Sequence, residues 1–135
     1  NFDTVRRAIS ESILDAGIQA TDIACVNAHA TSTRVGDKVE FDALDAVFGK
    51  KIPPVSANKS ITGHCMGASS AIEAILAMEG MKNGILPPTI NYTPDPELRL
   101  DCVPEEARHF DQEFVLKNAF GFGGCNACVV FRKIV

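Results

Sequence analysis

The chain has 135 residues, and its 13 Lys and Arg side chains against 17 Asp and Glu give a formal net charge of −4. This length suits one domain, and a hydrophobic content of 46% supports an ordinary core, which excludes a wholly disordered chain. The acidic balance and the scattered basic residues also exclude the charge pattern of proteins that bind nucleic acid or anionic membranes.

The first half of the chain alternates helix and strand patterns. Apolar residues recur at helical spacing over residues 3–16. Residues 23–27 form a short apolar run typical of a buried strand, which delivers His29 beyond its carboxyl end. A polar loop over residues 30–36 then leads to a second helix, predicted over residues 37–48.

A second strand and an unusually apolar helix follow. Residues 55–57, after two prolines, are a candidate short strand whose carboxyl end presents Lys59. The helix predicted over residues 67–82 is apolar or small nearly all the way round, apart from two glutamates. Such a helix is typical of a protein interior, so we expect a second layer over it that this chain does not supply.

The last third of the sequence predicts a long connection and a hairpin. Residues 86–106 are rich in Pro, Asp and Glu without a strong period, which favours an extended surface connection. Residues 113–120 and 126–134 have strand patterns and are joined by a glycine turn at residues 121–124. This arrangement favours an antiparallel hairpin.

Nothing in the sequence predicts a membrane span or a targeting signal. No apolar run reaches the roughly 18 residues of a span, and the amino end lacks a signal-peptide pattern, so we expect a cytoplasmic protein. Because the first residue is Asn1 and not Met, we also expect a piece of a longer product. The five cysteines show neither zinc nor redox spacing, which predicts small buried thiols and no metal ion.

Histidines follow the first two predicted strands, where open α/β sheets place ligands. His64 comes just before the apolar helix, so the helix dipole and the cation of Lys59 both disfavour its protonation. A neutral imidazole of this kind can donate an N–H to a developing oxyanion. His29 could do the same from the first strand. Considered alone, both residues also fit structural histidines that cap backbone groups.

Three motifs stand in order along the chain, at residues 27–33 (NAHATST), 58–64 (NKSITGH) and 118–124 (NAFGFGG). They resemble the motifs of the carboxyl-terminal half of β-ketoacyl-[acyl-carrier-protein] synthases, the elongating type II condensing enzymes. The resemblance runs over nearly the whole chain, because the stretches at residues 36–40, 86–91 and 103–108 also match.

The resemblance implies an α/β fold: a thiolase-like half-domain with a mixed sheet and helices on both faces, spanning residues 1–135. It further implies fatty-acid chain elongation, in which an acyl thioester on a cysteine condenses with malonyl-acyl carrier protein as carbon dioxide is lost. The amino-terminal half with that cysteine is absent from this sequence, so the chain alone is expected to be inactive. The implied partner is acyl carrier protein with its phosphopantetheine, with no cofactor bound directly, in a homodimeric full-length enzyme.

The resemblance also implies catalytic roles for three residues. His29 and His64 match the two histidines that donate N–H groups to the thioester oxygen. Lys59 matches the family's lysine, which we expect to pair with Glu40 and to order the His64 loop. An ordinary ion pair between Lys59 and Glu40 is an equally simple interpretation.

Further residues match positions that contact the substrate. Thr31 and Thr33 match hydroxyls that bind the pantetheine arm, although each could merely satisfy loop backbone. Phe122 matches the aromatic residue that gates the acyl pocket, with Phe120 in support, although it could be a core ring. Substrate-contact positions also include Gly121 and Gly123. These glycines would let the backbone approach the substrate closely, although they could instead form a plain hairpin turn.

Two other functions remain open from the sequence, besides a binding-only module, which the sequence supports least. One is a ketosynthase of polyketide or specialised lipid assembly, whose motifs overlap with those of fatty-acid elongation. The other is a non-catalytic chain-length-controlling partner subunit, which keeps the fold and loses the site. The joint presence of His29, His64 and Lys59 argues against the second.

Overall fold

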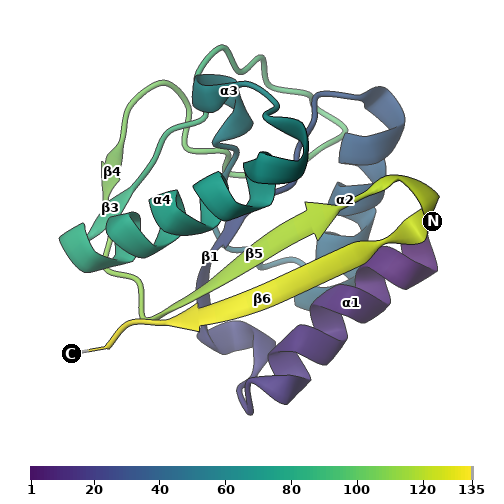
Figure 1. Ribbon diagram of the computed structural model, residues 1–135, viewed down its shortest axis with the longest axis horizontal. Helices are drawn as coiled ribbons and strands as arrows, with labels where there is room; N and C mark the ends of the chain where they lie inside the picture. The colour runs from purple at the N-terminus through teal and green to yellow at the C-terminus, as the bar shows by residue number, and fades with distance from the viewer. Residues whose placement is uncertain (135) are drawn as a thin grey trace.

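The computed structural model describes residues 1–134 around a four-stranded sheet of order β2-β1-β5-β6 (Figure 1). The central strand β1 (Ile23–Asn27) runs parallel to both β2 (Val55–Ser56) and β5 (Phe114–Phe120). β5 pairs antiparallel with β6 (Asn126–Arg132), which confirms the predicted hairpin. The sheet is therefore mixed, as expected.

Two helices pack on one face of the sheet. They are α1 (Phe2–Asp15) and α2 (Arg34–Phe48), and their apolar side chains share a core with Val26 and Leu116 of the strands. α2 begins three residues earlier than predicted because the Thr33 hydroxyl accepts the Gly36 N–H at 3.2 Å and caps the helix.

The apolar helix α4 (Ser69–Asn83) crosses the opposite face (Figure 1). Its Ala77 and Met81 join Cys25 and Val115 of the strands in a second core, so helices cover both faces of the sheet. On the outer side of α4, Ile75 and Met78 are 56% and 45% exposed, and none of residues 1–134 covers them. A further layer over this side remains a prediction.

The short elements complete the fold. Single turns at Ala20–Asp22, Met66–Ala68 and Phe122–Gly124 are 3-10 helices, and α3 (Lys59–Thr62) is one turn of α-helix. A two-stranded sheet joins β3 (Ile85–Leu86) to β4 (Arg108–His109). No helix within residues 1–134 is both long enough and apolar enough to cross a membrane.

The connection over residues 86–106 is anchored more firmly than its composition indicates. Thr89 and Pro104 form an isolated bridge, and Leu86, Thr89 and Val103 are buried. The expectation of an extended surface segment is therefore wrong for these residues, because apolar side chains at its two ends pack under α4 and the sheet.

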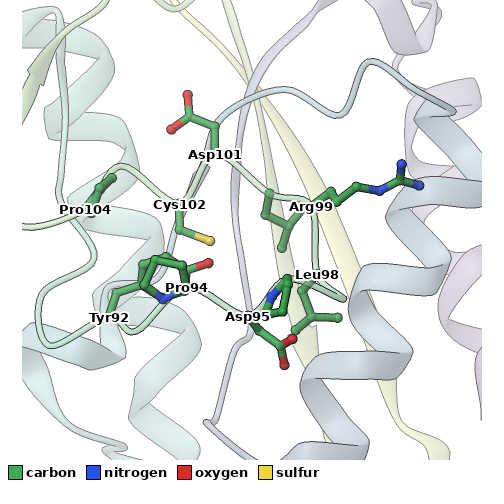
Figure 2. A pocket seen from close by; sticks show the side chains of 10 residues that line it. Tyr92, Pro94, Asp95, Leu98, Arg99, Asp101, Cys102 and Pro104 are labelled. Carbon is green, nitrogen blue, oxygen red and sulfur yellow. The ribbon is translucent and has the colours of Figure 1, made fainter.

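Beyond those anchors, the connection surrounds an open hollow of about 440 Å³ (Figure 2). Tyr92, Leu98 and Cys102 are among the side chains that line it. None of the residues expected at the functional site belongs to its wall.

Replacing Ile9 by Ala should lower the free energy of unfolding by about 2–5 kcal/mol, because this side chain is 0% exposed and its loss leaves a cavity. Leu14 on the same helix is 78% exposed, so Leu14→Ala should change that free energy by less than about 0.5 kcal/mol. Urea denaturation followed by circular dichroism measures both variants. Equal losses would contradict the orientation of α1.

Candidate active site

The carboxyl ends of β1, β2 and β5 lie at the same edge of the sheet because these strands are parallel. This edge brings His29, Lys59, His64 and Phe120 together. The His29 and His64 ring centroids are 6.1 Å apart with the ring planes at 89°. The Phe120 ring lies 5.6 Å from that of His29. The two histidine rings, which come from separate loops, are therefore neighbours.

The surroundings of His29 keep its imidazole uncharged. Partial burial, as the largest cause, and the nearby cations Lys59 and Lys117 together lower its pKa to about 4. The Lys59 ammonium donates to the His29 carbonyl oxygen and lies 3.4 Å from its Nδ1. A cationic donor facing Nδ1 favours the tautomer with its proton on Nε2.

Two contacts fix the ring of His64. The Met66 backbone N–H donates to its Nδ1 at 3.1 Å, and the Ser69 Oγ lies 3.0 Å from the same nitrogen. Because Nδ1 accepts a hydrogen bond, the proton of the neutral ring is on Nε2. The prediction that His64 directly precedes the apolar helix is wrong, because a turn over residues 65–68 separates the two.

The expected pairing of Lys59 with Glu40 is also wrong. The Lys59 Nζ lies 2.6 Å from Oε1 of Glu73, on the buried side of α4. The second oxygen, Oε2, lies 2.7 Å from Nζ of Lys117 in the middle of β5. All three side chains are nearly inaccessible, at 6%, 1% and 4% exposure for Lys59, Glu73 and Lys117. Glu73 is therefore the carboxylate that binds Lys59.

Glu40 instead holds the backbone of the loop after β1. Its Oε1 accepts the His29 N–H at 2.9 Å and the Asn118 side-chain N–H at 3.0 Å. Its Oε2 accepts the Ala30 N–H at 2.9 Å. Burial raises the pKa of this carboxyl, while the same N–H donors favour the charged form. Glu40 thus binds two successive backbone N–H groups of this loop, in which Ala30 has φ 35°.

The threonines lie together at the start of α2. The Thr31 and Thr33 hydroxyl oxygens are 3.3 Å apart. Thr33 caps helix α2, so its hydroxyl does satisfy a backbone N–H group, which is the simpler of its two interpretations. Both side chains are at least partly exposed, which leaves Thr31 accessible from solvent.

The glycine turn exposes its aromatic residue. The Phe122 side chain is 100% exposed, which excludes a core ring. The Gly121 N–H donates a hydrogen bond to the Cys125 carbonyl oxygen at 2.7 Å and closes the turn. Gly123 has φ +77°, a conformation that residues with a Cβ rarely adopt.

Sequence reasoning missed Glu73, Lys117 and Asn118. A signal existed for the first two, because a glutamate in an otherwise apolar helix and a lysine inside a strand pattern both predict buried charges that need partners. Asn118 gave no such signal beyond its place in the third motif.

The cysteines differ in part from expectation. Cys25 and Cys102 are buried and Cys128 is half-buried, but Cys65 and Cys125 are exposed. Cys65 directly follows His64, and Cys125 directly follows the glycine turn. Within residues 1–134, no group of three or more His, Cys, Asp or Glu side chains is arranged to hold a metal ion.

Known proteins are similar to this chain in sequence and in fold. The family model described as Beta-ketoacyl synthase, C-terminal domain, matches residues 1–93. The chain is similar to 3-oxoacyl-[acyl-carrier-protein] synthase 2 of Staphylococcus aureus, with 46% identity over 130 residues. That match covers 94% of this chain and 31% of the relative, so the chain spans about a third of the relative's length.

Two solved structures extend the likeness over 100% of this chain. The ishigamide ketosynthase/chain length factor matches with a TM-score of 0.98 and 38% identity, over 34% of that chain. A type II PKS acyl-carrier protein in complex with its ketosynthase matches with a TM-score of 0.94 and 31% identity, also over 34%. The expected thiolase-like half-domain is confirmed.

Glu40→Gln should lower the free energy of unfolding by about 2–4 kcal/mol, because an amide cannot accept all three N–H groups that the buried carboxylate accepts. The matched control is Asp42→Asn on the same helix, whose side chain is 39% exposed and pairs with Lys38. That change should cost less than about 0.5 kcal/mol. Denaturant titration compares them, and a Glu40→Gln protein as stable as the control would refute the backbone-holding role.

Proposed function

The chain belongs to the family of β-ketoacyl synthase C-terminal domains, and from this we propose that residues 1–135 are the carboxyl-terminal half-domain of a fatty-acid-elongating synthase. The observation that carries the proposal is the meeting of His29, His64 and Lys59 at one sheet edge. The nucleophilic cysteine comes from an amino-terminal half outside this sequence. The present chain alone is therefore inactive.

The proposed reaction is a decarboxylative Claisen condensation. The malonyl thioester loses its carboxylate as carbon dioxide, and the electron pair of the broken C–C bond moves onto the thioester to give an enolate. The Nε2–H groups of His29 and His64 donate to the enolate oxygen and lower the barrier. The α-carbon then attacks the acyl thioester on the cysteine, whose thiolate leaves.

Lys59 orders the site in this scheme. Its ammonium contacts the Glu73 carboxylate, the His29 carbonyl oxygen and the His29 ring nitrogen, so its donors are directed at protein atoms. A buried cation held in this way fixes the ring of His29 and does not carry a proton to substrate.

The remaining residues are proposed to bind the phosphopantetheine arm and the acyl chain. The hydroxyls of Thr31 and Thr33 would bind the arm of the acyl carrier protein. The exposed Phe122 would gate the acyl pocket, supported by Phe120. Substrate would pass close to the backbone at Gly121 and Gly123. The complex of acyl-carrier protein with a ketosynthase among the similar structures supports this partner.

We further propose that the complete enzyme is a cytoplasmic homodimer that binds no cofactor of its own. The exposed apolar side of α4, with Ile75 and Met78, supports a packing partner. Because the match covers only 31% of the relative, the partner that we propose for this side of α4 is the missing half of the fold.

A ketosynthase of polyketide or specialised lipid assembly is the second candidate. The likeness to the ishigamide ketosynthase/chain length factor, at 38% identity, favours it. Acyl-chain profiling of the products separates it from fatty-acid elongation. A non-catalytic chain-length-controlling subunit is disfavoured because His29, His64 and Lys59 are all present and in contact.

In the complete synthase, His64→Ala and His29→Ala should each slow malonyl decarboxylation at least about 100-fold, because each removes one donor to the enolate oxygen. The release of carbon dioxide from malonyl-acyl carrier protein measures this step apart from condensation. His109→Ala, at the exposed residue of strand β4, is the control and should retain the wild-type rate. Normal decarboxylation by the His64 variant would mean that the assigned role is wrong.

A further inference from the structure

A second buried lysine lies behind the two histidines and has no part in the reaction described above. Lys117 is in the middle of β5, on the sheet face that α4 covers. Its side chain is 4% exposed, and its Nζ lies 2.7 Å from Oε2 of Glu73. The same Nζ donates to the backbone oxygen of Asn118.

Burying this ammonium is costly, so its presence needs a reason. Burial lowers the pKa of Lys117, and Glu73 opposes that shift by favouring the charged form. The buried cluster around the site contains two carboxylates, Glu40 and Glu73, and two amines, Lys59 and Lys117. With all four charged, the cluster is neutral. Without Lys117 it would carry one unbalanced negative charge beside His29.

Geometry connects Lys117 to the imidazole through three contacts. Lys117 holds one oxygen of Glu73, which leaves the other oxygen on Lys59. Lys59 in turn binds the His29 carbonyl oxygen and faces its Nδ1 at 3.4 Å. A carboxylate held at both oxygens cannot rotate away from either cation. The chain of contacts therefore reaches from the middle of β5 to a catalytic ring.

We propose that Lys117 is a positioning residue for His29: its ammonium locks Glu73 onto Lys59 and balances the charge of the buried carboxylates. The catalytic role of His29 rests on the proposed function, but the link between Lys117 and His29 does not. Protonation of Nδ1 would place an N–H against the Lys59 ammonium and break the arrangement. Lys117 thus keeps the ring in its donating form.

The charged and titratable groups around His29 come from every element packed against it. Lys59 belongs to α3, Lys117 to β5 and Glu73 to α4, while His64 is in the loop after α3. Glu40 of α2 accepts the His29 backbone N–H. The two lysines and His64 disfavour imidazolium at His29, and Glu73 favours it. Removal of Lys117 alone shifts this balance toward imidazolium.

The test is Lys117→Met in the complete synthase, with nitrogen NMR of labelled histidine as the readout. In the wild type, His29 should titrate with a midpoint of about 4, and the variant should raise its proton affinity at least about tenfold. The acidic side of the pH–rate profile for decarboxylation should move to higher pH by the corresponding amount, about one pH unit for a tenfold change. A merely structural role would lower the rate at all pH values and leave the midpoint unchanged.

The control variant is Lys133→Met, which removes the same charge at the far end of the sheet, where Lys133 pairs with exposed Asp111. It should leave the His29 midpoint unchanged. A folded Lys117→Met protein that titrates His29 as the wild type does would overturn the proposal.

A wild-type measurement decides the matter if Lys117→Met does not fold. The ammonium resonance of Lys117 should show an inflection at the His29 midpoint, and His29→Gln should abolish it. A Lys117 resonance with no such inflection would overturn the proposal. Because neither NMR readout requires turnover, an inactive wild-type synthase would contradict the proposed function without deciding the role of Lys117.

Discussion

The ion pair between Lys59 and Glu73 is the interaction on which the site depends. It joins α3, which follows β2, to α4, which covers the sheet, and both side chains are removed from solvent. Breaking such a pair leaves an uncompensated buried charge and is strongly destabilising, whereas an exposed pair contributes little. The contacts of the Lys59 ammonium with the carbonyl oxygen and ring of His29 then follow from where Glu73 holds it.

Two buried carboxylates, one on each face of the sheet, hold the groups around His29. Glu40, from α2, accepts N–H groups and holds the loop that carries His29. Glu73, from α4 on the opposite face, forms ion pairs with the two ammonium groups. The position of His29 is therefore fixed from both sides of the sheet, through its backbone by Glu40 and through its ring by Lys59. Such support around a reacting group is what a preorganised site requires.

Most of the fold could be predicted from periodicity and breakers. The short apolar run of residues 23–27 and the hairpin around the glycine turn are local patterns, and both are confirmed. The start of α2 and the turn before α4 were misplaced because side-chain caps and single residues in unusual backbone conformations decide them. Composition also hid the buried anchors of the long connection, since Thr89 and Val103 lie in a stretch that is rich in Pro, Asp and Glu and has no strong period.

The site could be predicted only in part. The motifs locate His29, Lys59 and His64, because strand ends and family resemblance both point to them. The partner of Lys59 could not be chosen, because Glu40 and Glu73 are both acids on helices, and only the packing of those helices decides which carboxylate Lys59 reaches. Charge within an apolar pattern is the signal that identifies Glu73 and Lys117 in retrospect.

The central claim is that both imidazoles present an Nε2–H to the same region while Nδ1 is used within the protein. Nitrogen NMR of selectively labelled histidines in the complete synthase at pH 7 reports which ring nitrogen carries the proton. The account predicts a protonated Nε2 and an unprotonated Nδ1 for both His29 and His64. A proton on Nδ1 of either ring would contradict it.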